Sequence, residues 1–256
     1  MPVTISALAA LLALLFPWLG TAANAAEIRL LSAAAMQPVF EDIAPEFERS
    51  SGHKLLIIYA TVGGVNEKVF SGAQSDFVIG SSLSMPALVE HGMIDGGSLT
   101  PICKSGIGVV VATGTVMPHV NSVRAFRLAL LAATRIVYAD PARGGGAGIH
   151  VAKVIELMGL TDQLAPRVRL AAGGDVTEVT LGLGDGAVGI TQISEIVGKP
   201  GASLLGPLPT KIQNYTVFVG GTPLGVEQSE AVAAFLKFLR GPRSIAAIRA
   251  KGMDVE

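Results

Sequence analysis

Residues 28–59 read IRLLSAAAMQPVFEDIAPEFERSSGHKLLIIY, and this stretch determines the class of fold. Its two apolar runs, at 28–31 and 54–59, have the length and the aliphatic content of strands. Between them, apolar residues recur at the spacing of one helix face: Met36, Val39, Phe40, Ile43 and Phe47. Gly52 then predicts the end of that helix. Strand, helix and strand in this order predict a parallel βαβ unit.

The same alternation continues along the rest of the chain and predicts an α/β fold. Further strands are predicted at 76–80, 107–112, 135–139, 187–191 and 215–219. Helices are predicted from 61 to 70, 85–91, 123–133, up to Gly159, after Asp175, after 191, over 231–239 and over 244–251. Asp175 is expected to cap its helix.

Two blocks of alternating strands and helices predict two lobes. No low-complexity linker separates the blocks, which favours strands that cross between the lobes. The expected division places 27–106 together with 211–256 in lobe 1, and 107–210 in lobe 2.

Composition excludes several classes of protein. Half of the residues are apolar and 15% are charged, which excludes a disordered chain. The formal net charge of −1 comes without a clustered basic face, so no nucleic acid partner is expected. Cys103 is the single cysteine, which excludes an internal disulfide. We expect Cys103 to be a buried apolar residue.

The amino terminus has the pattern of a signal peptide. Residues 6–20 form an apolar run that is short for a membrane span and contains Pro17. Small residues at Ala23 and Ala25 then predict cleavage after Ala25 or Ala26. Residues 1–26 are therefore predicted to direct export and to be removed. The alternative is an uncleaved anchor, since residues 1–5 contain no Lys or Arg.

Four predicted strand-to-helix turns consist of small residues, at 32–35, 61–64, 144–148 and 173–176. Each turn places free backbone N–H groups at a helix start, where the helix dipole also attracts negative charge. Small side chains allow a ligand to approach that backbone closely. Two such turns in each block predict a cleft between the lobes that binds a small anion.

From residue 28 to the end, the chain resembles the periplasmic molybdate-binding proteins of ABC importers, which have the type II periplasmic binding protein fold. The resemblance rests on an ordered series of local motifs: SAAAM at 32–36, GAQSDFVI at 72–79, Asp140-Pro141 followed by AGI at 147–149, GGDV at 173–176, Gly189-Ile190, and FLKFLRGP at 235–242. It implies two lobes, each a mixed sheet flanked by helices, with the ligand cleft between them. It also implies a monomeric receptor in the periplasm that closes on its ligand, needs no cofactor, and delivers the ligand to an ABC permease.

The resemblance also implies positions for the ligand contacts. The family's two serines fall on Ala35 and on Val62, with Thr61 beside it, and its tyrosine falls on Gln192. The family's backbone donors fall on Ala147 and Val176. Three hydroxyl donors are thus replaced, and the loss of each hydrogen bond to a charged ligand costs roughly 1.5–3 kcal/mol.

Other polar residues are candidates to compensate for these losses. Ser32, Thr61 and Gln192 lie in or beside the turns, and Arg143 lies in a loop one residue longer than expected. An arginine there can meet a carboxylate with two hydrogen bonds. Apolar Ala35 and Val62 would suit a ligand that contains carbon. We therefore rank a small organic carboxylate slightly above molybdate or tungstate.

Two alternatives to a transport receptor stay open. A sensor that signals to a membrane partner would have the same fold. An enzyme is disfavoured, because none of the histidines is paired at metal-binding spacing: His53, His91, His119 and His150. His150 follows the glycine-rich turn, and we expect it on a helix surface.

Overall fold

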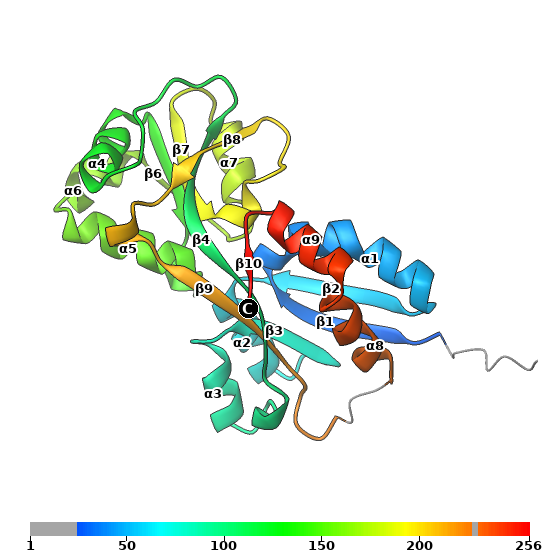
Figure 1. Cartoon of the computed structure of the whole chain (residues 1–256). Helices are drawn as coiled ribbons and strands as arrows, with labels where there is room; N and C mark the ends of the chain where they lie inside the picture. The colour runs from blue at the N-terminus through cyan, green and yellow to red at the C-terminus, as the bar shows by residue number, and fades with distance from the viewer. Residues whose placement is uncertain (1–24, 227–229) are drawn as a thin grey trace, which may run out of the picture.

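The computed structural model describes residues 25–226 and 230–256 and confirms the α/β fold class. Its strands form one curled sheet of order β2-β1-β3-β9-β4-β7-β5-β6, and β8 and β10 also pair with β4. The sheet bends between two lobes, each flanked by helices (Figure 1). The predicted signal peptide lies outside the described residues, apart from Ala25 and Ala26.

The first lobe contains both ends of the described chain. Its strands are β1 (Glu27–Ala33), β2 (Lys54–Ala60), β3 (Phe77–Ser81), the first half of β4 (Thr100–Ala112), β9 (Tyr215–Gly221) and β10 (Asp254–Val255). Its helices are α1 (Gln37–Ser51), α2 (Val62–Phe70), α3 (Met85–Glu90), α8 (Glu230–Leu239) and α9 (Pro242–Ala250), with 3-10 turns η1 (Ala34–Met36) and η2 (Gly96–Ser98). The predicted βαβ unit is confirmed, because β1 and β2 pair in parallel.

The second lobe is the central part of the chain. Its strands are the second half of β4, β5 (Arg135–Ala139), β6 (Val168–Ala171), β7 (Ala187–Gln192) and β8 (Ala202–Pro207). Its helices are α4 (Val123–Ala132), α5 (Gly146–Leu157), α6 (Thr161–Leu164) and α7 (Val176–Gly182). Four 3-10 turns complete it: η3 (Pro141–Arg143), η4 (Ala165–Arg167), η5 (Ile193–Glu195) and η6 (Thr210–Ile212).

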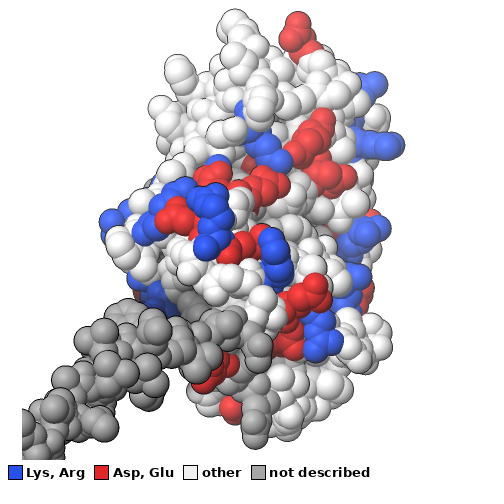
Figure 2. Space-filling view, turned by 90° about the vertical axis from the view of Figure 1, so that its right-hand side faces the viewer, with Lys and Arg blue, Asp and Glu red and all other residues white. Residues whose placement is uncertain are grey.

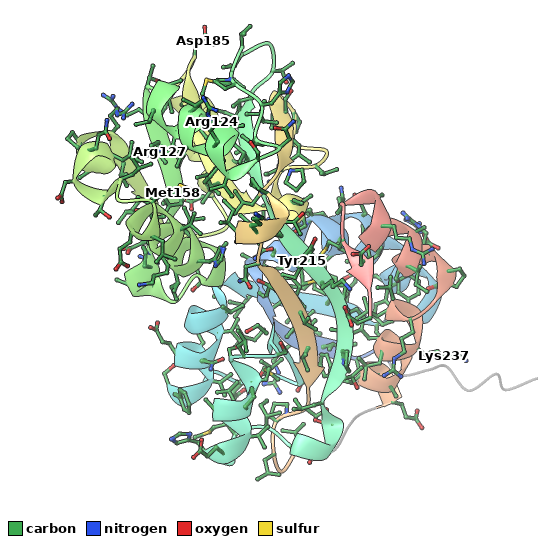
Figure 3. All side chains as sticks on the ribbon, turned by 60° about the vertical axis from the view of Figure 1, so that its left-hand side comes forward. Arg124, Arg127, Met158, Asp185, Tyr215 and Lys237 are labelled. Carbon is green, nitrogen blue, oxygen red and sulfur yellow. The ribbon has the colours of Figure 1, made fainter. Side chains whose placement is uncertain are left out.

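The long strand β4 connects the lobes. Residues up to Gly106 pair with β9, and residues from Ile107 onward pair with β7 and β8. Beside this change of partner, the Gln213 amide accepts from the N–H of Ile107 at 2.9 Å and donates to its carbonyl at 2.9 Å. Tyr215 begins β9 at the same level (Figure 3). The division of the chain into 27–106 with 211–256 and 107–210 is a proposal that this pairing supports.

Several predicted elements were wrong in extent. β4 begins at Thr100 rather than at 107, because its first half pairs with β9. Strands β6, β8 and β10 were not predicted: β6 and β10 are short, and no residue of β8 is buried. The helix expected after β7 is only the 3-10 turn η5.

Each lobe has apolar cores on both faces of its sheet. In the first lobe, Phe40, Phe47 and Phe235 join α1 and α8 on one face, and Val65 of α2 lies in the core on the other. Cys103 is fully buried in the first of these cores, as predicted, and burial raises the pKa of its thiol to about 12. The thiol therefore stays protonated and unreactive at neutral pH.

Charges on the surface are mixed in sign. Figure 2 shows acidic and basic side chains interspersed over one face of the molecule. Between α1 and the α9 region, ion pairs join Arg243 of α9 to Glu46 at 2.9 Å, and Lys251, just after α9, to Asp42 at 3.0 Å. In the described part of the chain, no helix is both long and apolar enough to span a bilayer.

The lobes touch directly where α2 of the first lobe meets the loop before α5 of the second. The N–H of Gly63 donates to the carbonyl of Gly144 at 3.0 Å, and the Thr61 hydroxyl donates to the carbonyl of Arg143 at 2.6 Å. Deeper inside, the Ser194 hydroxyl donates to the carbonyl of Ala35 at 2.9 Å. These bonds hold the two lobes in a closed arrangement.

The contact requires glycine at position 144. Its φ of +69° lies in the left-handed region, and a Cβ there would lie 2.7 Å from Cα of Gly63. Gly144→Ala should therefore separate the lobes, measured as a larger radius of gyration in small-angle X-ray scattering than for the wild type.

Gly159→Ala is the matched control for this substitution. Gly159 has a similar φ of +65°, but a Cβ there would meet nothing within 4 Å. It should lose a similar amount of stability, about 1–2 kcal/mol, without opening the lobes. Equal scattering from the two variants would contradict the role assigned to the Gly63–Gly144 contact.

Candidate functional site

A pocket lies between the lobes, directly behind the contact of Gly63 with Gly144. Its volume is about 50 Å³. The first lobe contributes Ala33, Ala34, Ala35, Thr61, Val62, Thr216 and Phe218, and the second contributes Ala139, Gly145, Gly146, Ala147, Gly173, Gly174, Thr191, Gln192 and Glu195. The pocket has more space than a single water molecule requires.

The start of α2 supplies one open backbone donor. Thr61 is the N-cap, and its hydroxyl accepts from the N–H of Gly64 at 3.0 Å. The N–H of Gly63 is used by the contact with Gly144. Among the described residues, the N–H of Val62 then has no partner at this helix start. Val62 lines the pocket, so its N–H is available to a ligand.

The start of α5 supplies open donors from the other lobe. The first intrahelical bond runs from the N–H of Ile149 to the carbonyl of Gly145 at 2.9 Å, so the N–H groups before Ile149 have no intrahelical acceptor. Gly146 and Ala147, at this start, line the pocket. The helix can lie so close to β5 because residue 148 is glycine: a Cβ there would lie 1.9 Å from the carbonyl oxygen of Ala139.

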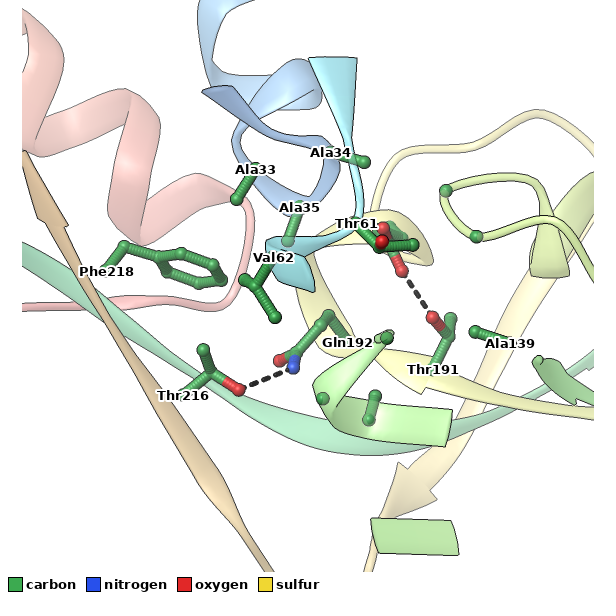
Figure 4. A pocket seen from close by; sticks show the side chains of 16 residues that line it. Ala33, Ala34, Ala35, Thr61, Val62, Ala139, Thr191, Gln192, Thr216 and Phe218 are labelled. Carbon is green, nitrogen blue, oxygen red and sulfur yellow. Dashed lines mark hydrogen bonds between the residues drawn. The ribbon is translucent and has the colours of Figure 1, made fainter. Parts of the chain in front are cut away.

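A buried amide forms the base of the pocket. Gln192 is 6% exposed, and its Nε2 donates to Oγ1 of Thr216 at 2.8 Å. Its Oε1 is buried and has no hydrogen-bond partner within the described structure. Figure 4 shows this amide between Val62 and Thr216. A buried, unpartnered polar atom on a pocket wall is a place where a ligand atom is expected.

A buried carboxyl lies in the same wall. Glu195 is 6% exposed, and one of its oxygens accepts a short hydrogen bond from the Thr191 hydroxyl. Burial raises the pKa of Glu195 to about 6, and the hydrogen bonds from Thr191 and from the backbone of Gln192 oppose that rise. Glu195 is the one ionisable side chain among the residues that line the pocket.

The structure brings five of the eight predicted ligand contacts to this pocket: Ala35, Thr61, Val62, Ala147 and Gln192. Ser32 is instead buried in β1, where its hydroxyl donates to the carbonyl of Ala33 at 3.2 Å. Val176 is buried in a small core with Val137 and Ala171.

Arg143 is the third predicted contact that does not line this pocket. It lines the neighbouring cavity, which shares Thr61 and Gly173 with the pocket and also contains Lys68. Its side chain is exposed there.

The predicted cap by Asp175 is corrected. Asp175 occupies the N-cap position of α7, but its side chain makes no bond to the helix. It accepts instead from the N–H of Gly173 at 2.8 Å. Gly173, with a φ of +108°, packs against the Thr61 methyl, and the carboxylate stabilises this turn.

Sequence reasoning missed Glu195, Thr191, Thr216 and Phe218. A glutamate after a strand normally predicts an exposed surface position, and no local signal reveals that η5 buries this one. Thr216 and Phe218 lie in β9, more than 150 residues after the first turns, and only the fold brings them to the pocket. His150, expected on a helix surface, is half-buried, with its Nε2 2.7 Å from the carbonyl oxygen of Ile212.

No group of His, Cys, Asp or Glu in the described residues could hold a metal ion. Backbone donors from both lobes, small residues and one amide instead form a site suited to a small polar molecule with negative charge.

Known proteins similar to this chain include both a binding protein and an enzyme. A molybdate-binding protein of Azotobacter vinelandii is 24% identical over 249 residues, covering 93% of this chain and 94% of its own length. An aconitate isomerase of a Pseudomonas species is 25% identical over 232 residues, covering 88% of this chain and 87% of its own length.

Solved structures show the same fold. The periplasmic molybdate-binding protein of Azotobacter vinelandii superposes with a TM-score of 0.74 at 18% identity, covering 90% of this chain and 99% of that one. The sequence relative and this shared fold confirm the resemblance to molybdate-binding proteins that the motifs indicated. The model of the family described as bacterial extracellular solute-binding protein matches residues 28–254, and the chain belongs to that family.

Proposed function

We propose that the protein captures a small anion in the pocket between its lobes, in the periplasm, and delivers it to an ABC permease. The observation that carries the proposal is the meeting of open N–H groups from two lobes, at Val62 and Ala147, on one pocket. Partial positive charge at the helix starts stabilises an anion there without a cationic side chain. Closure over the ligand by hinge motion would present the permease with a distinct, loaded form.

The pocket's walls favour a ligand with carbon as well as oxygen. Ala35, Val62 and Phe218 present apolar surface, and no hydroxyl stands at the positions of Ala35 and Val62. A carboxylate of a few non-hydrogen atoms fits a volume of about 50 Å³. A tetrahedral oxyanion such as molybdate or tungstate also fits that volume, but it leaves these apolar contacts unused.

We propose that binding, and not catalysis, is the function. One observation favours an isomerase as the second candidate: Glu195 places a carboxyl with a pKa of about 6 in the pocket wall. Such a group can take a proton from one carbon of an unsaturated acid and return it to another as the double bond shifts. That reaction needs no co-reactant. The aconitate isomerase relative makes aconitate the substrate to test.

The binding proposal predicts thermal stabilisation by the right anion, because a ligand that binds only the folded state raises the melting temperature. A screen of molybdate, tungstate, sulfate, phosphate and small carboxylates by thermal denaturation measures it. At least one of these anions is expected to raise the midpoint by several degrees at millimolar concentration. No shift with any of them would overturn the proposal.

The substitution Val62→Pro tests the backbone donor itself. Proline fits the first helical position and removes the N–H, and the extended Thr61 backbone, with φ −60° and ψ 160°, is compatible with a following proline. The variant should fold normally and bind the stabilising anion at least about tenfold more weakly, measured by calorimetry.

Val123→Pro is the matched control. Val123 is the first residue of α4, outside the pocket, and its N-cap Ser122 is also extended, with φ −143° and ψ 158°. This variant should keep wild-type affinity. Equal affinity of both proline variants would contradict a ligand contact at the N–H of Val62.

The isomerase candidate is tested by incubating the protein with one aconitate isomer and following the other by NMR. We expect no conversion above the rate without protein. Conversion that Glu195→Gln abolishes would replace the binding proposal with the enzyme.

A further inference from the structure

The pocket contains open hydrogen-bond acceptors as well as open donors, and the acceptors bear on which groups the ligand must carry. Its lining contains no Lys, Arg or His, and its single ionisable group is the carboxyl of Glu195. A pocket proposed to hold an anion thus places that anion beside a second negative group. Like charges in a site of low dielectric repel strongly unless a proton lies between them.

Several side-chain protons around the pocket are already committed. The Thr61 hydroxyl donates to the carbonyl of Arg143, and the Thr191 hydroxyl donates to Glu195. The Gln192 amide donates to Thr216. In the described lining, the further donors are the backbone N–H groups at the helix starts, the second N–H of that amide, and the hydroxyl of Thr216, which accepts from Gln192.

The acceptors, in contrast, are left open. Oε1 of Gln192 is buried with no partner in the described chain, and the ionised Glu195 carboxylate can accept more than the bonds from Thr191 and Gln192. Neither acceptor can be satisfied by an anion that has only lone pairs on its surface. A bound hydroxyl would satisfy one of them and remove the repulsion.

We propose that the ligand is an anion that carries its own hydrogen-bond donor. Its anionic end would accept from the open N–H groups near Val62 and Ala147, while its hydroxyl or protonated oxygen donates to Glu195 or Gln192. Two kinds of ligand share this chemistry: a small hydroxycarboxylate and a protonated oxyanion. The inference rests on the proposed anion-binding function and narrows its ligand class.

The protonation state of Glu195 makes the inference testable by pH. Burial and the charge of Glu178 raise its pKa, while the hydrogen bonds from Thr191 and the backbone of Gln192 and the charge of Lys199 lower it, and the resulting pKa is about 6. At pH 7.5 the group is therefore mostly ionised and accepts from a ligand hydroxyl. A ligand without a donor must instead bring a proton onto Glu195, so its affinity should fall as pH rises above 6, with proton uptake on binding.

Two matched ligand pairs test the proposal by calorimetry at pH 7.5: glycolate with acetate, and phosphate with sulfate. The first member of each pair carries a donor and the second carries none. In at least one pair, the donor-bearing ligand should bind at least about tenfold more tightly. A difference within the glycolate and acetate pair would identify the ligand as a hydroxycarboxylate. A difference within the phosphate and sulfate pair would identify it as a protonated oxyanion.

Glu195→Gln should reduce that ratio to about threefold or less, since an amide offers a donor to an anion that has none. Glu156→Gln is the control, because Glu156 is an exposed carboxylate on α5, paired with Lys153 and distant from the lining. It should leave the ratio unchanged. Thermal denaturation of both variants checks that they fold.

The outcomes separate the two proposals. Binding in both pairs without discrimination, or a ratio that survives Glu195→Gln, would overturn the donor inference and leave anion binding intact. No binding of these anions or of any anion in the thermal screen would overturn the proposed function itself.

Discussion

The close approach of two glycine backbones, at Gly63 and Gly144, is the constraint on which the site depends. It joins the start of α2 in one lobe to the loop before α5 in the other, through a hydrogen bond of 3.0 Å. Any Cβ at either position would lie within 2.7 Å of the opposite backbone. Because these glycines permit contact, the open N–H groups behind them face one small pocket instead of two separate surfaces.

The electrostatics of the pocket follow from that geometry. Helix starts provide partial positive charge that is fixed in place and requires no ion pair. The nearby cations Arg143 and Lys68 line the adjoining cavity. The charges at the pocket itself are therefore the partial positive charges of the backbone dipoles and the carboxyl of Glu195. The weak positive field of the helix starts would attract many anions of suitable size. Selectivity between them therefore depends on the pattern of hydrogen-bond donors and acceptors in the pocket.

Much of this architecture could be predicted from the sequence, because its signals are local. The apolar spacing of residues 36–47 predicts α1, and the small residues at 61–64 and 144–148 predict the helix starts that form the pocket. The rest depends on tertiary packing. Asp175 is a residue type that favours N-caps, but it stabilises the turn at Gly173 instead. Glu195 is buried where η5 packs against the first lobe, beside the bond from Ser194 to Ala35. Thr216 reaches the pocket through the order of strands in the sheet.

The claim that backbone N–H groups bind the ligand is tested most directly by NMR of the amides. On saturation with an anion that raises the melting temperature, the amide protons of Val62 and Ala147 should shift downfield, while that of Val123 at the start of α4 should not move. Both lobes would then be seen to donate to one ligand. Thermal stabilisation by an anion that leaves the amides of Val62 and Ala147 unshifted would contradict this account of the site.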